Sequence, residues 1–206
     1  MKKKDNVFVY ELHDNLYINL TNKCTSNCEF CVRNQQDGMD GEHVLWLKHE
    51  PSADEIMEQL DEFDVAKYRQ IVYCGYGEPT LRLDVLLESA KKIKEKYSKF
   101  IRINTNGHAN LYFKRDVTPD FAGVIDKVSI SLNHSRADEY DKICHSRYGE
   151  DAFAALLDFA EKCKKYVPNV VLTIVDILPE DIQNECKDIA AKIGVDLRIR
   201  ELINKD

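Results

Sequence analysis

The sequence predicts an α/β fold of mostly parallel strands that begins with a β-hairpin. Three observations predict it: seven short strand-like runs, amphipathic helical stretches between the later runs, and the composition of a globular protein. The chain has 206 residues, of which 44% are hydrophobic and 32% are charged. This length supports one substantial core, so we expect a single domain over residues 1–206.

Strand-like runs set the framework of the predicted sheet. They cover 7–12, 15–20, 69–74, 99–104, 126–132, 169–175 and 196–202. Only His13 and Asp14 separate the first two runs, which predicts an antiparallel hairpin. The later runs are separated by longer intervals that leave room for the crossover helices that parallel strands require.

Helical patterns fill these longer intervals. In the second of them, Leu83, Leu86 and Ile93 lie on one side of the helix, while lysines and glutamates occupy the other. Right-handed crossovers of this kind build either an incomplete (β/α)6 barrel or a doubly wound sheet, and the pattern fits both. The predicted helices cover 53–66, 81–97, 136–144, 150–166 and 179–193.

Segment 32–52 interrupts the alternation of strands and helices. It is polar, contains two glycines and ends in a short VLWL cluster. Long loops of this kind usually carry function or connect mobile parts. We interpret the segment as an inserted lid over a neighbouring site, with a mobile linker as the alternative.

Charge and hydropathy narrow the range of partners and locations. A net charge of -7 gives no general attraction to a nucleic-acid backbone, so nucleic acid is not an expected partner. No window approaches the roughly 20 apolar residues that span a bilayer. The N-terminus lacks the apolar stretch of a signal peptide. We therefore expect a cytoplasmic protein without a membrane partner.

Three cysteines form the most informative cluster, CTSNCEFC, at Cys24, Cys28 and Cys31. The chain has seven cysteines, and the other four are dispersed, which argues against a disulfide framework. Three thiolates on one loop can bind one metal cluster with a coordination position left open, because structural zinc and electron-transfer clusters use four protein ligands. The alternatives are a set of buried thiols or a zinc site completed by His43 or His49.

Alternation along four predicted strands places polar side chains on one face. Helices must cover the apolar faces of a parallel sheet, so the polar faces line the interior. Val, Ile and Leu fill the interior of an ordinary barrel, so a polar interior indicates a bound polar ligand. A sheet with one solvated face is the alternative. The polar residues include Tyr17, Asn19, Arg102, Asn104, Ser129, Ser131, Asn133, Arg198 and Arg200.

The stretch YINLTNKCTSNCEFC resembles the strand-plus-CxxxCxxC signature of the radical S-adenosylmethionine superfamily. The resemblance implies a partial (β/α)6 TIM-like barrel in which Cys24, Cys28 and Cys31 ligate three irons of a 4Fe-4S cluster. It implies that S-adenosylmethionine chelates the fourth iron and that Phe30 lies beside the adenine. It also implies reductive cleavage of S-adenosylmethionine to a 5′-deoxyadenosyl radical, which abstracts a hydrogen atom from the substrate.

A second stretch, YCGYGEPT, resembles the GGEP motif of the same superfamily, which contacts the methionine amino group. Tyr76 separates Gly75 from Gly77, so the usual adjacent glycines are interrupted and Gly77-Glu78-Pro79 carries the match. A plain turn between a strand and a helix is the alternative.

Two later stretches extend the resemblance. INTNGHA at 103–109 resembles the fourth motif, and SISLN at 129–133 resembles the strand that contacts ribose or the methionine carboxylate. An Asn-Gly turn and a Ser-rich strand are the alternatives. The resemblance thereby implies cofactor contacts from Gly75, Gly77, Glu78, Asn104, Asn106, Ser129, Ser131 and Asn133.

The last strand offers a substrate clamp. Arg198 and Arg200 can bind a carboxylate or a phosphate through their guanidinium groups, and surface ion pairs are the alternative. His108 and His134 follow the predicted inner-face positions and are candidate proton donors.

Within the superfamily, the sequence is similar to small radical proteins encoded near TatD-type hydrolases, and that similarity supplies no reaction. The alternatives are an enzyme similar to 7-carboxy-7-deazaguanine synthase or to a glycyl-radical activase. A non-catalytic zinc or iron-sulfur binding module is the alternative from another class. Expected partners are S-adenosylmethionine, a small-molecule or protein substrate, and an electron donor such as flavodoxin or ferredoxin.

Overall fold

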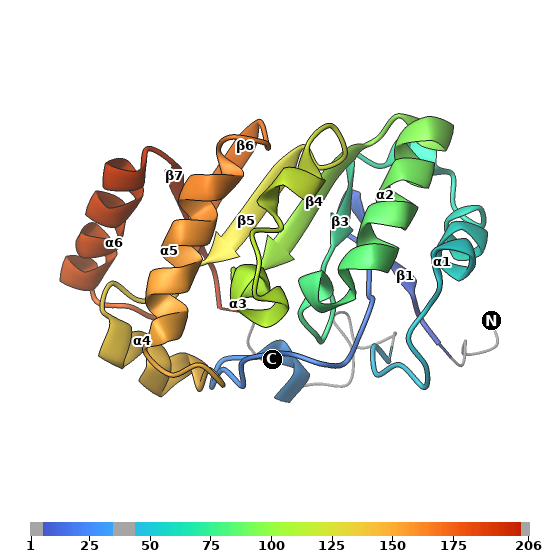
Figure 1. The fold of residues 1–206 in the computed structure, drawn as a ribbon. Helices are drawn as coiled ribbons and strands as arrows, with labels where there is room; N and C mark the ends of the chain where they lie inside the picture. Colours follow the sequence, from blue (N-terminus) through green and yellow to red (C-terminus); the bar gives the residue numbers. More distant parts are fainter. Residues whose placement is uncertain (1–5, 35–43, 203–206) are drawn as a thin grey trace.

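The computed structural model describes residues 6–34 and 44–202. Its seven strands lie in one sheet in chain order (Figure 1). They are β1 (Val9–Leu12), β2 (Asn15–Ile18), β3 (Gln70–Tyr73), β4 (Phe100–Thr105), β5 (Lys127–Ser131), β6 (Asn169–Val175) and β7 (Asp196–Arg200). The first pair is antiparallel and all later pairs are parallel. Within the described residues β7 pairs only with β6, so the barrel is partial, as predicted.

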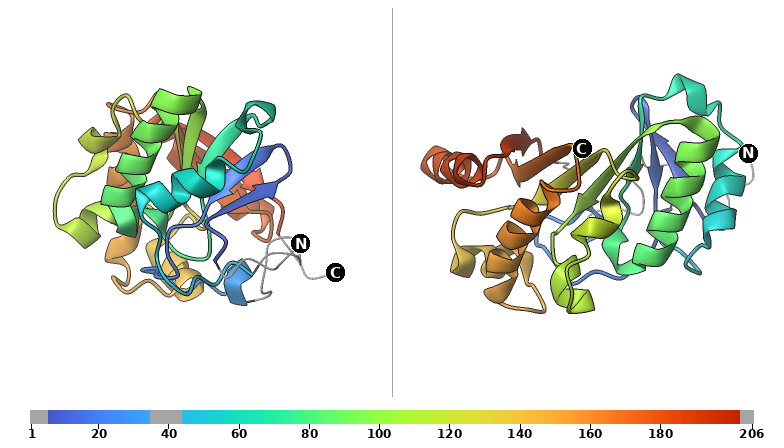
Figure 2. Two further views of the ribbon diagram at one scale, coloured as in Figure 1. Left: turned by 90° about the vertical axis from the view of Figure 1, so that its right-hand side faces the viewer. Right: turned by 45° about the horizontal axis from the view of Figure 1, so that its top comes forward.

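At least one helix lies between each two successive parallel strands. The helices cover one side of the curved sheet, as Figure 1 and the right-hand view of Figure 2 show. They are α1 (Ala53–Leu60), α2 (Leu83–Tyr97), α3 (Ala109–Phe113), α4 (Ala137–Cys144), α5 (Asp151–Cys163) and α6 (Glu180–Ile193). Within the described residues no helix is both long enough and apolar enough to cross a bilayer.

Two helical predictions need correction. The helix expected over 53–66 begins with a capping box between Ser52 and Glu55 but ends at Leu60, and a 3-10 turn follows at Val65–Lys67. Val65 is buried, so the chain turns into the core there instead of continuing the helix. The short helix α3 was not predicted, because five residues are too few to show a helical period.

The two faces of the sheet differ as the alternation predicts. Ile18, Ile103 and Ile130 are completely buried on the helix-covered side. On the opposite face, Arg102 and Ser129 are also buried, at 8% and 7% exposure, and so are Asn19 and Thr173. Much of the polar face is therefore buried, as a polar interior requires, whereas Arg198 on the edge strand is exposed.

The described end of the predicted lid is packed onto the carboxyl end of β2. The side-chain amides of Asn19 and Asn22 donate hydrogen bonds to the carbonyl oxygens of Leu45 and Leu47, at 2.7 and 2.8 Å. Both leucines are buried. This end of the loop is therefore held in place against β2. Residues 35–43 of the predicted lid lie outside the described residues.

Candidate functional site

The three cysteines lie on the loop after β2, at the carboxyl ends of the parallel strands, in the blue segment at the bottom of Figure 1. The end of α4 holds this loop. The backbone N–H groups of Asn27 and Glu29 donate to the carbonyl oxygens of Cys144 and Ile143, each at 3.0 Å. The loop is therefore attached to the barrel wall on the side of α4.

Cys24, Cys28 and Cys31 are each half-buried on this loop. The thiol of Cys28 is hydrogen-bonded to that of Cys144, and the Cys24 sulfur accepts a 3.4 Å hydrogen bond from the backbone N–H of Ser26. Among the described residues, no three His, Cys, Asp or Glu side chains adopt a metal-binding arrangement. The loop thus brings the thiols to one end of the barrel without converging their sulfur atoms.

The electrostatic environment keeps these thiols protonated. Burial raises the pKa of Cys24 to about 12 and also raises the pKa of Cys31. The hydrogen bond with Cys144, followed by burial, raises the pKa of Cys28. Metal ligation requires thiolates, so binding of a cluster must release protons here.

Arg33 opposes this effect at all three cysteines, because its positive charge lowers each thiol pKa. Its guanidinium group donates to the Ser26 carbonyl oxygen at 3.3 Å and to Asn27 Oδ1 at 3.0 Å. Arg33 is a site residue that the sequence did not predict. Its place two residues after Cys31 was the available signal.

Glu78 connects the turn after β3 to the end of β4. Its buried carboxylate accepts hydrogen bonds from the hydroxyls of Thr80 and Thr105 at 2.6 and 2.7 Å, and from the backbone N–H of Asn106 at 2.8 Å. Burial raises the Glu78 pKa, while these bonds favour the ionised form. Through these hydrogen bonds, which we call the Glu78 clasp, Glu78 fixes the backbone of Asn106.

Asn106 carries this connection to the cysteine loop. Its side-chain amide donates to Thr25 Oγ1 at 2.8 Å and lies 3.8 Å from the Cys24 sulfur. The structure therefore brings together two residues that the sequence predicted separately, Glu78 and Asn106, and places them next to the first cysteine.

His108 supports the same loop. Its ring nitrogens are hydrogen-bonded to Thr25 Oγ1 at 3.1 Å and to Tyr140 Oη at 2.9 Å. Burial lowers the His108 pKa to about 4, so the ring is neutral at pH 7 and both nitrogens are engaged. These contacts argue against the predicted role of proton donor. Burial also lowers the pKa of His134, whose Nδ1 accepts a 3.2 Å bond from the backbone N–H of Arg136.

Gly75 and Gly77 allow the turn after β3 to approach the strand that leads to the cysteines. A Cβ on Gly75 would lie 2.1 Å from Asn19 Oδ1, and one on Gly77 would lie 2.3 Å from the carbonyl oxygen of Thr21. The second contact is with backbone, which cannot move aside without shifting the loop. Close packing therefore explains why both positions are glycine.

The remaining predicted cofactor residues line the inner face of the sheet. Asn104 and Ser129 are register partners on β4 and β5, and Ser131 follows on β5. Asn133 donates to the Cys144 sulfur at 3.3 Å, and its Oδ1 is buried without a partner. Asn19 Oδ1 and Ser26 Oγ are buried without partners as well. Such orphaned polar atoms fit a polar ligand bound at this end of the barrel.

Three predicted residues lie away from these contacts. Phe30 is half-buried and packs against the main core. Arg200 is half-buried with an unpartnered Nε, whereas Arg198 is exposed on the edge strand β7. Neither arginine forms an ion pair with a carboxylate in the described part of the chain, which disfavours the surface ion-pair alternative.

The histidines of the zinc alternative do not assemble with the cysteines. His49 Nε2 lies 2.8 Å from Glu55 Oε1, beside the start of α1, and its Nδ1 is hydrogen-bonded to Asn6. His43 lies outside the described residues. The loop thiols therefore lack the zinc partner expected from His49.

Comparison with known proteins assigns the family. The family model of the radical SAM superfamily matches residues 18–193. The chain belongs to the radical SAM superfamily. This match covers the cysteine loop and the whole of strands β3 to β6.

Two curated relatives of this radical SAM protein are longer than it is. A probable GTP 3′,8-cyclase of Thermococcus kodakarensis is 31% identical over 91% of this chain. Molybdenum cofactor biosynthesis protein 1 of Drosophila melanogaster is 27% identical over 92% of it. The chain spans 56% and 32% of the lengths of these two proteins, respectively.

Solved structures of other proteins show the same fold at low sequence identity. Streptococcus suis SuiB, crystallised with S-adenosylmethionine, matches 91% of this chain and 38% of its own at a TM-score of 0.59 and 16% identity. Methylornithine synthase matches 93% of this chain and 54% of its own at a TM-score of 0.60 and 13% identity. The superfamily implies a 4Fe-4S cluster and S-adenosylmethionine, and the three thiols and the orphaned polar atoms suit both.

Proposed function

We propose that this radical SAM protein is an enzyme that cleaves S-adenosylmethionine reductively and uses the resulting radical to abstract a hydrogen atom from its substrate. One observation carries the proposal: three half-buried thiols lie on a single loop at the end of the barrel where Asn19, Ser26 and Asn133 have buried polar atoms without partners. The family match supports the same chemistry.

Cys24, Cys28 and Cys31 would hold the cluster through three thiolates. When bound, the cluster supplies one electron that splits the sulfonium into methionine and a 5′-deoxyadenosyl radical. Arg33 offsets the negative charge of the thiolates, and the α4 end fixes the loop that carries them. The chain thereby positions the ligands and compensates their charge.

The inner-face residues would bind and orient S-adenosylmethionine. Glu78 fixes Asn106, whose amide contacts the cysteine loop and is placed to contact a ligand beside it. Asn133 and Asn19 offer free amide oxygens to the ammonium or hydroxyl donors of the cofactor. We assign the cofactor contacts to Phe30, Gly75, Gly77, Glu78, Asn104, Asn106, Ser129, Ser131 and Asn133.

The two arginines of β7 would bind the substrate. Arg198 and Arg200 are without carboxylate partners in the described residues, which suits a carboxylate or phosphate on the substrate. Since the chain spans only part of its relatives, we limit the proposal to radical formation and hydrogen abstraction. The proposal includes a single domain that acts in the cytoplasm with a flavodoxin or ferredoxin as electron donor.

Anaerobic reconstitution tests this function. Protein reconstituted with iron and sulfide should release 5′-deoxyadenosine from S-adenosylmethionine when dithionite is added. Cys24→Ala, Cys28→Ala and Cys31→Ala should each abolish the release, whereas Cys186→Ala, a buried position on α6, should not. Tightly held zinc without iron-sulfur absorbance after reconstitution would instead support the metal-binding module.

A further inference from the structure

A second cavity lies at the end of the barrel opposite to the cysteines. It has a volume of about 590 Å³ and is lined by residues at the amino ends of β2 to β5. The charged side chains in this lining are Arg69, Arg102 and Lys127 against the single carboxylate of Asp14, beside His13. Three cations and one anion leave two excess positive charges at this mouth of the barrel.

Arg102 is the most unusual member of the lining. It lies on the inner face of β4 and is only 8% exposed, yet its Nε has no hydrogen-bond partner. Its Nη2 makes one long contact, 3.5 Å to Tyr17 Oη. Arginines elsewhere, such as Arg82 with Glu50, form ion pairs, but Arg102 has none in the described part of the chain. A buried guanidinium without a counter-charge is costly unless a ligand supplies one.

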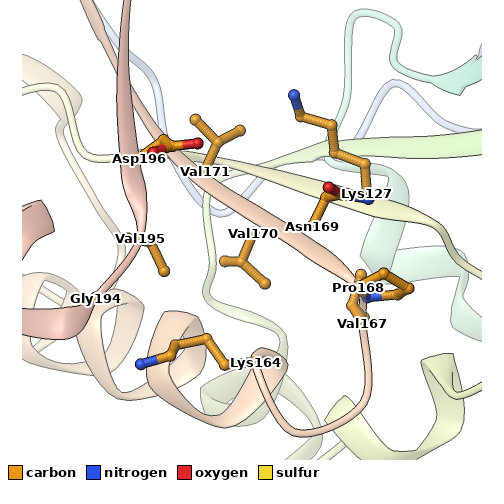
Figure 3. Close-up of a pocket in the computed structure, with 10 residues that line it drawn as sticks. All are labelled: Lys127, Lys164, Val167, Pro168, Asn169, Val170, Val171, Gly194, Val195 and Asp196. Carbon is orange, nitrogen blue, oxygen red and sulfur yellow. The ribbon is translucent and has the colours of Figure 1, made fainter.

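Lys127 increases the electrostatic cost of burying the Arg102 guanidinium. It is the register partner of Arg102 on the neighbouring strand, so two like charges face each other across the ladder. Burial lowers the Lys127 pKa, and the charges of Arg102 and Arg198 lower it further; Asp196 opposes them with the smallest effect. In the adjoining pocket of about 420 Å³, Figure 3 shows Lys127 extending on the same side as Val171, away from Val170.

We propose that Arg102 and Lys127 form an oxyanion site at the amino-end mouth of the barrel, which holds a phosphate or carboxylate group of the substrate. The assignment of this ligand as substrate rests on the proposed function, and the existence of the site does not. A ligand with two negative charges would balance the excess charge of the lining. Guanidinium and ammonium groups together suit such an oxyanion.

The spacing of residues along β4 indicates the length of this substrate. Asn104 lies two residues after Arg102 along β4, or about 7 Å at 3.3 Å per residue. An anion held by Arg102 therefore lies roughly one sugar or nucleoside length from the S-adenosylmethionine end. The anionic group and the reacting carbon would then lie towards opposite ends of the inner face of the sheet.

Binding of simple oxyanions tests the site directly. Isothermal titration of the full reconstituted chain with pyrophosphate, inorganic phosphate and succinate should show saturable binding. Pyrophosphate or phosphate as the tighter ligand identifies a phosphorylated substrate, and succinate as the tighter ligand identifies a carboxylated one. Arg102→Met and Lys127→Gln should each weaken binding by about tenfold or more, since each removes a charge-assisted contact. Arg115→Gln, which breaks a surface pair with Asp120, is the matched control.

Thermal unfolding provides a second readout. Without anions, Arg102→Met should raise the Tm because it removes an uncompensated buried charge, and pyrophosphate should no longer stabilise the variant. The site is disproved if none of the three anions binds, or if both variants bind as tightly as Arg115→Gln. Because these measurements require no turnover, 5′-deoxyadenosine release without anion binding rejects this site but retains the proposed function. Anion binding without 5′-deoxyadenosine release retains this site but rejects the proposed function.

Discussion

Glu78 accepts a hydrogen bond from the backbone N–H of Asn106 at 2.8 Å, which joins the turn after β3 to the end of β4. Asn106 in turn contacts Thr25 on the cysteine loop. The position of the loop therefore depends on a carboxylate that lies 53 residues after Thr25 in the sequence.

Replacing the carboxylate of Glu78 should loosen the loop. In the wild type, the hydroxyls of Thr80 and Thr105 and the backbone N–H of Asn106 donate to the Glu78 carboxylate. Glu78→Gln replaces this carboxylate with a neutral amide that accepts fewer hydrogen bonds. We therefore expect the free energy of unfolding to fall by about 1–3 kcal/mol. Urea denaturation measures the loss. Glu88→Gln, which affects only a surface pair with Lys92, should change stability by about 0.5 kcal/mol or less. Equal denaturation midpoints for the two variants would show that the hydrogen bonds of Glu78 do not stabilise the protein.

Adding a methyl group at Gly77 should displace the cysteine loop. The new Cβ would meet the Thr21 carbonyl oxygen at 2.3 Å, so Gly77→Ala should both destabilise the protein and reduce iron uptake on reconstitution. Gly123→Ala is the control, because its Cβ meets nothing within 4 Å. The control should lose only about 1 kcal/mol, from its left-handed backbone, and keep its iron. Full iron content in Gly77→Ala would show that the loop tolerates the methyl group.

Cys144 should be dispensable for the cluster. Its thiol contacts Cys28 and Asn133, but it lies on α4 rather than on the cysteine loop. Cys144→Ala should therefore retain the iron content of the wild type and lose about 1 kcal/mol of stability, from the lost hydrogen bonds. Iron analysis after reconstitution measures the first effect. A loss of iron as large as that of Cys28→Ala would instead make Cys144 a ligand.

His108 should make the protein sensitive to acid. Its folded pKa of about 4 lies below the usual value near 6.5, so its contribution to stability is complete above pH 6.5 and is lost as the pH falls towards 4. The difference corresponds to about 3 kcal/mol at most. Urea denaturation between pH 7 and 4 should show this decline, and His108→Gln should flatten it. An unchanged slope in the variant would assign the acid sensitivity to other groups.

The sequence by itself determined the parts of this protein that depend on local pattern. Alternation along the strands predicted which residues face the interior, and Arg102 and Ser129 lie there. The spacing of Cys24, Cys28 and Cys31 identified the loop and its chemistry, because three thiols within eight residues are a local property. The order of strands and helices followed from the same periodicities.

Only the tertiary structure decided how distant residues meet. The contact of Cys144 with Cys28 and the clasp of Glu78 on Asn106 join segments whose separation leaves no periodic signal. His108 looked suited to proton transfer, but burial between Thr25 and Tyr140 makes it a neutral support. The missing counter-charge of Arg102 was also invisible, because a charge is unpaired only with respect to everything folded around it.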